Sequence, residues 1–175
     1  MSFIKRLSQK NSGFTLIELL VVVVIVGILS LVVMSKVTMW VDNSKEAKTK
    51  DALRDLKVQV KRYYAENSGF YPERLDETQR PSPSDTNTTM PAFIPHFMNK
   101  MPKTCLRSGT NHKDTDYVTM ITNTTDVDRL MDTGDITDHS GWIYSSTTGE
   151  IRINCTHVDS KQKIQYSTYG YEAME

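Results

Sequence analysis

The sequence predicts an α+β fold, in which one long N-terminal helix packs against a small C-terminal antiparallel β-sheet. The first observation is an apolar run from Phe14 to Met34, whose length suits a continuous helix. The second is an amphipathic stretch after that run, where apolar residues recur every three or four positions. The third is a set of short β-branched or alternating segments beyond residue 116, which are typical of half-buried strands.

The apolar run has the length of a membrane span. Its 21 residues would form a helix of about 32 Å, against a hydrocarbon core of about 30 Å. Three basic residues and no acidic residue precede the run, and this asymmetry predicts a cytoplasmic N-terminus and an exported C-terminal part. The basic residues are Lys5, Arg6 and Lys10.

A basic leader before an apolar run has two ordinary interpretations, a cleaved secretory signal and a plain membrane anchor. A secretory signal has an apolar core of about 7–15 residues followed by small residues, whereas this run is longer and ends in Val33-Met34-Ser35-Lys36. A plain anchor does not explain Glu18, because a carboxylate within hydrocarbon costs about 2.5–3.5 kcal/mol on insertion scales. Glu18 is therefore a candidate functional residue.

The segment Gly13-Phe14-Thr15-Leu16-Ile17-Glu18-Leu19-Leu20 resembles the processing site of bacterial type IV pilins and type II secretion pseudopilins. The resemblance implies cleavage between Gly13 and Phe14 and N-methylation of Phe14. It also implies that Glu18 pairs with the Phe14 amine of a neighbouring subunit and so sets the register of assembly. Such a pair offsets the cost of burying either charge alone. The implied partners are other copies of the chain, a prepilin peptidase, an inner-membrane assembly platform and minor pilins or pseudopilins.

The resemblance divides the chain into three parts. Residues 1–13 would be a cleaved leader peptide, and residues 14–39 the transmembrane and assembly half of the long helix. Residues 40–175 would form a periplasmic or extracellular pilin-like domain, containing the amphipathic half of the helix, a loop region and the sheet. The filament would then be anchored in, and assembled from, the bacterial inner membrane.

The amphipathic half of the helix should pack one apolar face against its own domain. Glu46 and Lys50 are spaced as a favourable i,i+4 ion pair. Asn67-Ser68-Gly69 predicts the end of the helix, because Gly69 suits a left-handed cap. The apolar face consists of Leu53, Leu56, Val60 and Tyr63.

After the helix, Phe70–Leu75 resembles the "YP-x-x-L" stretch of many major pseudopilins. Residues 80–89 predict a polar loop by composition, and 92–103 a non-regular, proline-punctuated segment. Four later segments predict strands, with Ile151, Ile153 and Cys155 on a buried face opposite Arg152 and Asn154. These strands are expected at 117–122, 141–145, 150–155 and 164–169, and the hairpin at 141–154 also resembles the ending of pseudopilin-like proteins.

The two cysteines, Cys105 and Cys155, would lie in an oxidising compartment, which favours a disulfide between them. Such a bond would close a loop of about 50 residues and stabilise the fold by about 4 kcal/mol in the chain-entropy model. The alternative is two unpaired thiols, with Cys155 buried as a small apolar residue in its strand. No C-x-x-C spacing indicates a redox pair.

An acidic stretch could bind Ca²⁺, which prefers six to eight hard oxygen ligands, but a solvated loop is the favoured interpretation. Some major pseudopilins hold calcium at a comparable place, although the spacing here matches no EF-hand. The acidic residues are Asp126, Asp128, Asp132, Asp135 and Asp138. The four histidines, His96, His112, His139 and His157, show no ligand spacing and are interpreted as surface residues, so no bound metal is predicted.

The sequence predicts a structural protein and not an enzyme. It contains no G-x-S-x-G, Walker A or H-E-x-x-H motif. Its equal numbers of acidic and basic residues, 21 each, argue against general nucleic-acid binding. The resemblance favours a major pseudopilin of a type II secretion system. A type IV pilus subunit, for adhesion, motility or DNA uptake, and a non-polymerising anchored binding domain remain as alternatives.

Overall fold

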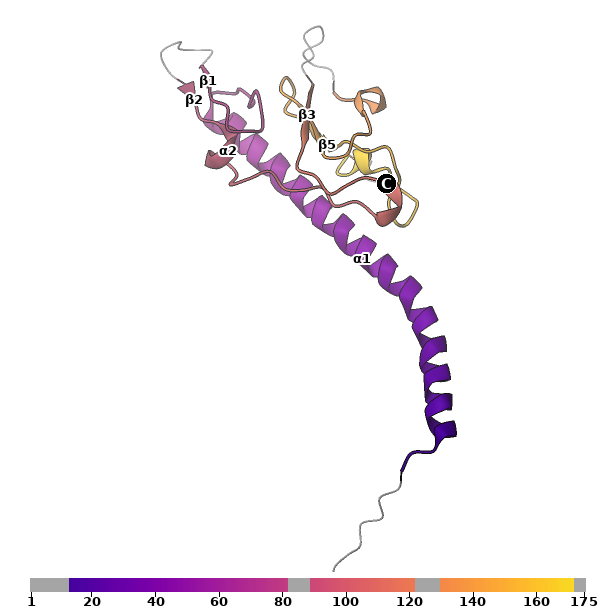
Figure 1. Ribbon diagram of the computed structural model, residues 1–175. Coiled ribbons are helices and arrows are strands. Elements are labelled where there is room, and N and C mark those ends of the chain that lie inside the picture. Colours follow the sequence, from indigo (N-terminus) through magenta and orange to yellow (C-terminus); the bar gives the residue numbers. More distant parts are fainter. Residues whose placement is uncertain (1–12, 82–88, 122–129, 172–175) are drawn as a thin grey trace, which may run out of the picture. The chain divides into compact units, whose positions relative to one another are not determined.

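The computed structural model describes residues 13–81, 89–121 and 130–171. The chain forms two compact units, Met1–Met39 and Trp40–Glu175. One helix, α1 (Leu16–Glu66), contributes to both units, and every strand lies in the second (Figure 1). This architecture confirms the predicted α+β fold with a long N-terminal helix.

The part of α1 in the second unit buries the apolar face that its spacing predicts. Leu53, Leu56, Val60 and Tyr63 are all almost completely buried. The helix ends at Glu66, where the Asn67 N–H donates to the Tyr63 carbonyl (3.0 Å) and the Gly69 N–H donates to the Tyr64 carbonyl (3.0 Å). Gly69 has a φ of 84°, so the predicted glycine stop is confirmed.

Glu46 does not behave as an exposed member of an i,i+4 pair. It is buried, and its two carboxylate oxygens accept hydrogen bonds from Ser160 and from the Tyr166 hydroxyl (2.6–2.8 Å). Lys50 instead places its ammonium 4.0 Å from the centre of the Tyr169 ring. The expected pairing of Glu46 with Lys50 was wrong because helix spacing carries no information about segments that pack from more than 100 residues away.

The main sheet has the order β3-β4-β5, with β3 at Val118–Ile121, β4 at Trp142–Ser145 and β5 at Ile151–Ile153. β4 and β5 pair antiparallel, as the predicted hairpin requires, but β3 and β4 pair parallel. The expectation of a purely antiparallel sheet was therefore wrong. The connection over residues 122–141 is long enough for a crossover, and a parallel pair requires a dozen or more residues there.

Two other segments also differ from the predicted strands and loops. The ends of the predicted 80–89 loop pair as a two-stranded sheet, with β1 at Arg80–Pro81 and β2 at Thr89–Met90. The predicted strand at 164–169 is instead a 3₁₀ turn at Tyr166–Thr168 with one isolated bridge, Val158–Gln165. Tyr166 and Tyr169 are both buried in edge-to-face contact, and this spacing of three is incompatible with strand alternation.

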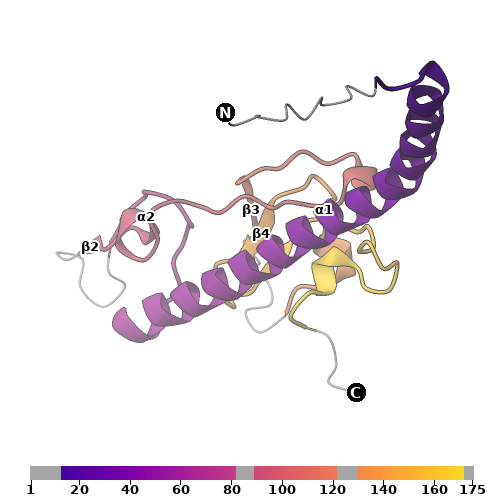
Figure 2. The ribbon, with the colours of Figure 1, turned by 90° about the horizontal axis from the view of Figure 1, so that it is seen from below.

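The core of the second unit lies between α1 and the sheet, and the two views show β3 beside the second half of the helix (Figures 1 and 2). Trp142 donates from its indole N–H to the Pro102 carbonyl (2.7 Å), and Tyr144 donates its hydroxyl to the Pro72 carbonyl (2.7 Å). These bonds fix the proline-punctuated segments against β4. The segment over 92–103 contains only one short helix, α2 (Phe93–His96), with a non-helical residue inside it.

The β5 alternation continues correctly at Ile151, Ile153 and Cys155, which are all buried. Asn154, expected on the wet face, is also fully buried. Its carboxamide oxygen accepts from the backbone N–H groups of Thr137 (2.9 Å) and Asp138 (3.1 Å). Asn154 therefore anchors the loop before β4, which is the reason for its burial.

Candidate functional site

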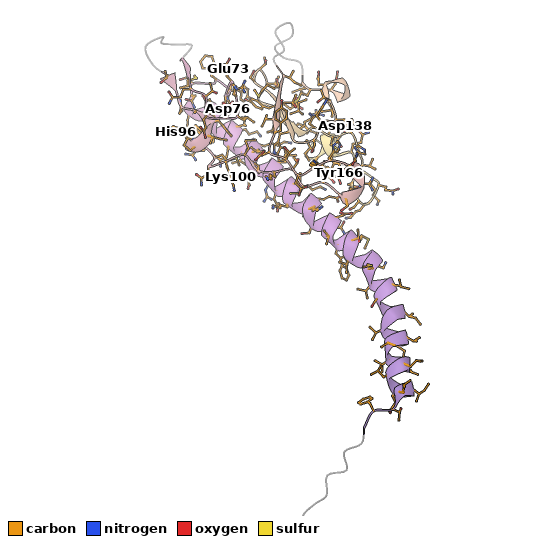
Figure 3. All side chains as sticks on the ribbon, in the orientation of Figure 1. Glu73, Asp76, His96, Lys100, Asp138 and Tyr166 are labelled. Atoms are coloured by element: carbon orange, nitrogen blue, oxygen red, sulfur yellow. The ribbon has the colours of Figure 1, made fainter. Side chains whose placement is uncertain are left out.

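The described part of the first unit is mainly helical, and its apolar side chains are exposed among the residues that the structure describes. Every large apolar side chain from Phe14 to Met39 that the structure describes is exposed, the least exposed being Val37 at 44%. Figure 3 shows these side chains extending from all sides of the ribbon. This part of α1 is long and apolar enough to cross a membrane.

The N-terminus of α1 is closed by a reciprocal pair of side chains. The Thr15 backbone N–H and hydroxyl both donate to Glu18 Oε2 (2.9 and 2.8 Å), and the Glu18 backbone N–H donates to Thr15 Oγ1 (3.3 Å). This arrangement is a capping box, in which the residue at the cap and the residue three positions later satisfy each other's backbone donors. The T-x-x-E spacing was present in the sequence, and our sequence analysis missed this role of Thr15.

The capping box places the predicted processing residues outside the helix. Gly13 and Phe14 precede the helical residues, and Phe14 is 84% exposed. A peptide bond outside regular structure is accessible to a peptidase without local unfolding. Phe14 and Glu18 also line one shallow depression on the helix surface, together with Ile17, Val21 and Val22.

The structure does not confirm the predicted disulfide between Cys105 and Cys155. Both cysteines are free and buried. The Cys105 thiol contacts the Lys103 carbonyl (3.8 Å), and the Cys155 thiol contacts His157 Nδ1 (3.5 Å). The two sulfurs therefore have different neighbours, and the open alternative of two buried thiols agrees with the structure.

The weak calcium candidates do not converge in the described part of the chain. Asp126 and Asp128 lie outside the described residues. Asp132 and Asp135 serve as acceptors within their own turn, since Asp132 Oδ1 accepts from the Gly134 N–H (2.7 Å) and Asp135 Oδ2 from the Asp132 N–H (2.9 Å). Asp138 lies at a separate place, beside two histidines and a cysteine (Figure 3 labels Asp138).

This separate cluster was not predicted from the sequence. It consists of His112, Asp138, Cys155 and His157, and one side-chain ligand atom from each lies within 4.8 Å of all the others. Our sequence analysis treated the histidines as isolated because three distant segments contribute to the cluster. The Cys155-x-His157 pair was the only local signal for it.

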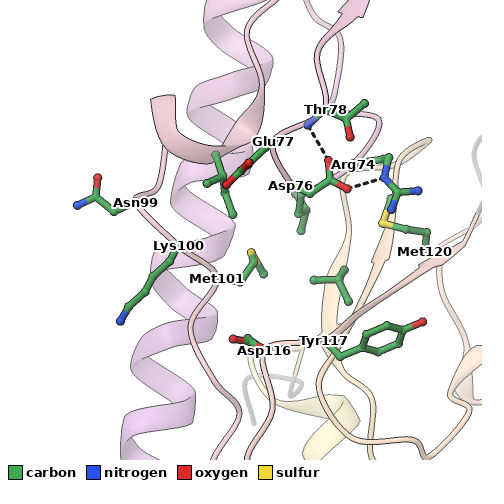
Figure 4. Close-up of a pocket in the computed structure, with 13 residues that line it drawn as sticks. Arg74, Asp76, Glu77, Thr78, Asn99, Lys100, Met101, Asp116, Tyr117 and Met120 are labelled. Carbon is green, nitrogen blue, oxygen red and sulfur yellow. Dashed lines mark hydrogen bonds and ion pairs between the residues drawn. The ribbon is translucent and has the colours of Figure 1, made fainter.

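A hollow of the second unit with a volume of about 600 Å³ lies beside β3 (Figure 4). Arg74 donates to Asp76 Oδ2 (2.6 Å), and the Thr78 N–H donates to Asp76 Oδ1 (2.9 Å). Burial opposes ionisation of Asp76, but the Arg74 and Thr78 contacts outweigh it and hold the pKa of that carboxyl below its usual value. No Ser, Cys or His is among the described residues that line this hollow.

Comparison with known proteins bears on the N-terminal segment. Residues 8–34 match the family model described as the prokaryotic N-terminal methylation motif. The chain is also 34% identical over 80 residues to the type IV major pilin protein PilA of Myxococcus xanthus. That similarity covers 41% of this chain and 36% of the pilin's length, and no solved structure matches the chain. The chain therefore carries a prokaryotic N-terminal methylation motif, and part of it is similar to a type IV major pilin.

Proposed function

We propose that this chain is a structural subunit of a type IV pilin-like filament. The observation that carries the proposal is the coincidence, in one segment, of three features. The N-terminal methylation motif covers residues 8–34, these residues include most of the uncovered apolar part of α1, and Glu18 lies in the first turn of the helix. A helix that is apolar on all sides is stable only in lipid or among other helices.

In this proposal a prepilin peptidase hydrolyses the Gly13–Phe14 bond and leaves a free amine at Phe14, which is then N-methylated. The mature chain stays in the inner membrane through residues 14–39, with residues 40–175 on the periplasmic or extracellular side. An inner-membrane assembly platform then transfers subunits from the lipid into the filament. Packing between apolar helices replaces their contacts with lipid tails.

Glu18 can serve the cap and the assembly contact at once. A carboxylate has about four lone-pair positions, and the donors from Thr15 converge on Oε2. In the proposed filament, Oε1 would accept from the protonated amine of Phe14 in an adjacent subunit. Within the low-dielectric helix bundle each charge would offset the burial cost of the other.

The motifs in the chain favour a type II secretion system, whereas the comparison with a known pilin favours a type IV pilus. The Phe70–Leu75 stretch and the hairpin at 141–154 resemble major pseudopilins, which supports a role in type II secretion. The similarity to the Myxococcus xanthus pilin supports a type IV pilus instead. If the chain is a pilus subunit, its deletion should remove long surface fibres and leave protein secretion intact. If it is a pseudopilin, its deletion should block protein secretion and leave surface fibres intact. The minor subunits and the assembly platform that it contacts would belong to the same system.

The experiment that tests the proposal compares two variants of the first helical turn. Glu18→Gln keeps an acceptor for the capping box but removes the charge, because glutamine also forms such boxes. Thr15→Ala weakens the cap and keeps the charge. We expect Glu18→Gln to be cleaved normally and to give at least a tenfold lower filament yield, and Thr15→Ala to assemble more nearly like the wild type.

Intact mass and N-terminal peptide analysis provide the control for processing. A chain that begins at N-methyl-Phe14 supports a type IV pilin-like subunit. A chain that keeps Met1 supports the alternative of a non-polymerising membrane-anchored binding domain. Normal filament yield from Glu18→Gln would show that the carboxylate acts only as a helix cap.

A further inference from the structure

A second cluster of functional side chains lies in the second unit, remote in sequence from the N-terminal motif. It joins three segments: His112 follows a 3₁₀ turn at Ser108–Thr110, Asp138 precedes β4, and Cys155 and His157 follow β5. The proposed filament function uses none of these residues. An inference about them therefore does not depend on that function.

Three of the six separations between the ligand atoms fit a single tetrahedral ion, and all six are within 4.8 Å. His112 Nε2 lies 3.3 Å from Asp138 Oδ1, which lies 3.6 Å from His157 Nδ1, and this nitrogen lies 3.5 Å from Cys155 Sγ. Around Zn²⁺, with bonds of about 2.0–2.1 Å to nitrogen or oxygen and about 2.3 Å to sulfur, neighbouring ligand atoms lie roughly 3.3–3.6 Å apart. The three measured separations all fall in this range.

The donor set has the character of a zinc site and not of a calcium site. Two imidazoles, one thiol and one carboxylate combine borderline and soft donors, whereas Ca²⁺ takes six to eight hard oxygens. A thiolate and a carboxylate would together balance the charge of a divalent ion. Binding would displace the proton of the Cys155 thiol to solvent as the sulfur–metal bond forms.

One atom of the cluster lacks a hydrogen-bond partner. His112 Nε2 is buried and has no hydrogen bond to the residues that the structure describes, although Asp138 lies near it. A buried ring nitrogen without a partner is costly in a protein interior. Coordination to a metal ion would satisfy this nitrogen.

The surrounding backbone holds the ligands in place. Asp138 Oδ1 accepts from the Thr156 N–H (2.8 Å), which fixes the carboxylate between the two rings. Asp138 also donates its own N–H to the buried Asn154 side chain (3.1 Å). The His112 and His157 rings meet edge to face, 5.0 Å between centres. Such contacts around the ligands orient the site and tune its affinity.

We propose that His112, Asp138, Cys155 and His157 bind one Zn²⁺ ion. The ion would join the loop before β4, the segment after β5 and the loop at residue 112. All four positions of the tetrahedron come from the protein, which is the arrangement of a structural site. The ion would thus cross-link these three segments through its ligand bonds, whereas no disulfide joins Cys105 and Cys155 in the structure.

The test uses the reduced, metal-free full chain in detergent, with Co²⁺ as a spectroscopic probe and Zn²⁺ as competitor. We expect one equivalent of Co²⁺ to produce a thiolate-to-metal charge-transfer band and the intense visible bands of a tetrahedral complex, and Zn²⁺ to abolish both. Cys155→Ser should remove the charge-transfer band. His112→Gln should weaken binding by at least about 100-fold, beyond the effect typical of an outer-shell change.

Two matched controls use the other buried thiol and a histidine outside the cluster, namely Cys105→Ser and His96→Gln, which should bind like the wild type. Should Cys155→Ser fail to fold by circular dichroism, His112→Gln carries the test alone. If both cysteines are reduced, as shown by reaction with a thiol reagent, and no cobalt bands appear, the proposal is overturned. The cluster would then be an ordinary contact between histidine and aspartate side chains. A charge-transfer band that persists in Cys155→Ser, or is lost in Cys105→Ser, would overturn it as well.

Discussion

Glu46 holds the C-terminal segment against α1 through hydrogen bonds from Ser160 and Tyr166. It lies on α1 and accepts the Ser160 N–H (2.6 Å), the Ser160 hydroxyl (2.8 Å) and the Tyr166 hydroxyl (2.7 Å), while only 6% of it remains exposed. Burial, followed by the Glu46 contact, raises the pKa of Tyr166 well above its usual value, so the tyrosine remains a donor. A buried carboxylate is tolerated here because each of its oxygens is used.

Glu46→Ala should therefore be strongly destabilising. Removing the carboxylate takes the acceptor from the partly buried Ser160 N–H and from the buried Tyr166 hydroxyl, at about 1–3 kcal/mol for a fully buried group and less for a partly buried one. We expect the free energy of unfolding to fall by about 2–4 kcal/mol, measured by thermal unfolding of the full chain in detergent, with near-ultraviolet circular dichroism as the signal.

Glu66→Ala on the same helix is the matched control. Glu66 is about half exposed and pairs only with Arg62 at i,i+4 (2.7 Å), so its loss should change stability by no more than about 0.5 kcal/mol. Equal effects of the two substitutions would contradict the role assigned to Glu46.

At the scale of single residues, the apolar face of α1 and the N-terminal methylation motif could be predicted from the sequence. The burial of Glu46 and Asn154 could not, nor could the partly buried cluster of His112, Asp138, Cys155 and His157. The apolar face is a local pattern, since residues three and four apart share one side of a helix. The polar residues are buried through partners that lie between 16 and 120 positions away, and no local pattern encodes such partners.

Among the elements, β4 is the central strand of the main sheet, because it pairs with β3 on one side and β5 on the other. The backbone that leads into β4 is therefore constrained from both sides. Gly141 precedes it with a φ of 80°, a region that favours glycine. A Cβ at this position would collide with the Tyr117 carbonyl oxygen, the same oxygen that accepts the Trp142 N–H (2.8 Å). The parallel pairing of β3 and β4 thus begins at a contact that only glycine permits.

Gly141→Ala is expected to lower the stability of the second unit by about 2 kcal/mol or more, because backbone strain and a steric clash act together. Urea or thermal unfolding of the full chain measures the change. Gly109→Ala should be neutral or slightly stabilising, since a Cβ there meets only the end of the Arg107 side chain at 3.8 Å. If Gly141→Ala does not change the stability, the backbone before β4 can shift away from the Tyr117 carbonyl, and the predicted clash is wrong.

The β4–β5 hairpin was predictable because its strands alternate and flank a Thr-Gly turn. The direction of β3 was not predictable, because a β-branched segment has the same sequence pattern in a parallel and in an antiparallel pair. The strand predicted at 164–169 failed for a related reason: Tyr166 and Tyr169 satisfy strand propensity, yet tertiary packing places them in a 3₁₀ turn.

At the scale of the whole molecule, the chain combines an uncovered apolar helix with a domain that has its own core. The second unit, Trp40–Glu175, contains all the buried apolar residues that the structure describes. Its first residues belong to α1, so the domain keeps its part of the helix when the first unit is removed. Domains with a self-contained core can generally fold alone.

A chain that begins at Trp40 should accordingly be soluble without detergent and monomeric. We expect its melting temperature to lie within a few degrees of that of the full chain, with light scattering as the measure of its oligomeric state. Aggregation or a missing unfolding transition would show that the domain depends on residues 1–39 for stability.

The Glu46 network also has a consequence for timing. Glu46 is synthesised early, whereas Ser160 and Tyr166 follow it by 114 and 120 positions. Contacts between positions this far apart form late, since the intervening chain must be present first. A chain whose synthesis stalled before residue 160 would leave the apolar face of α1 that contains Leu56 incompletely covered. Such an intermediate would be open to proteases, so the second unit resists them only once its C-terminal segment has been made.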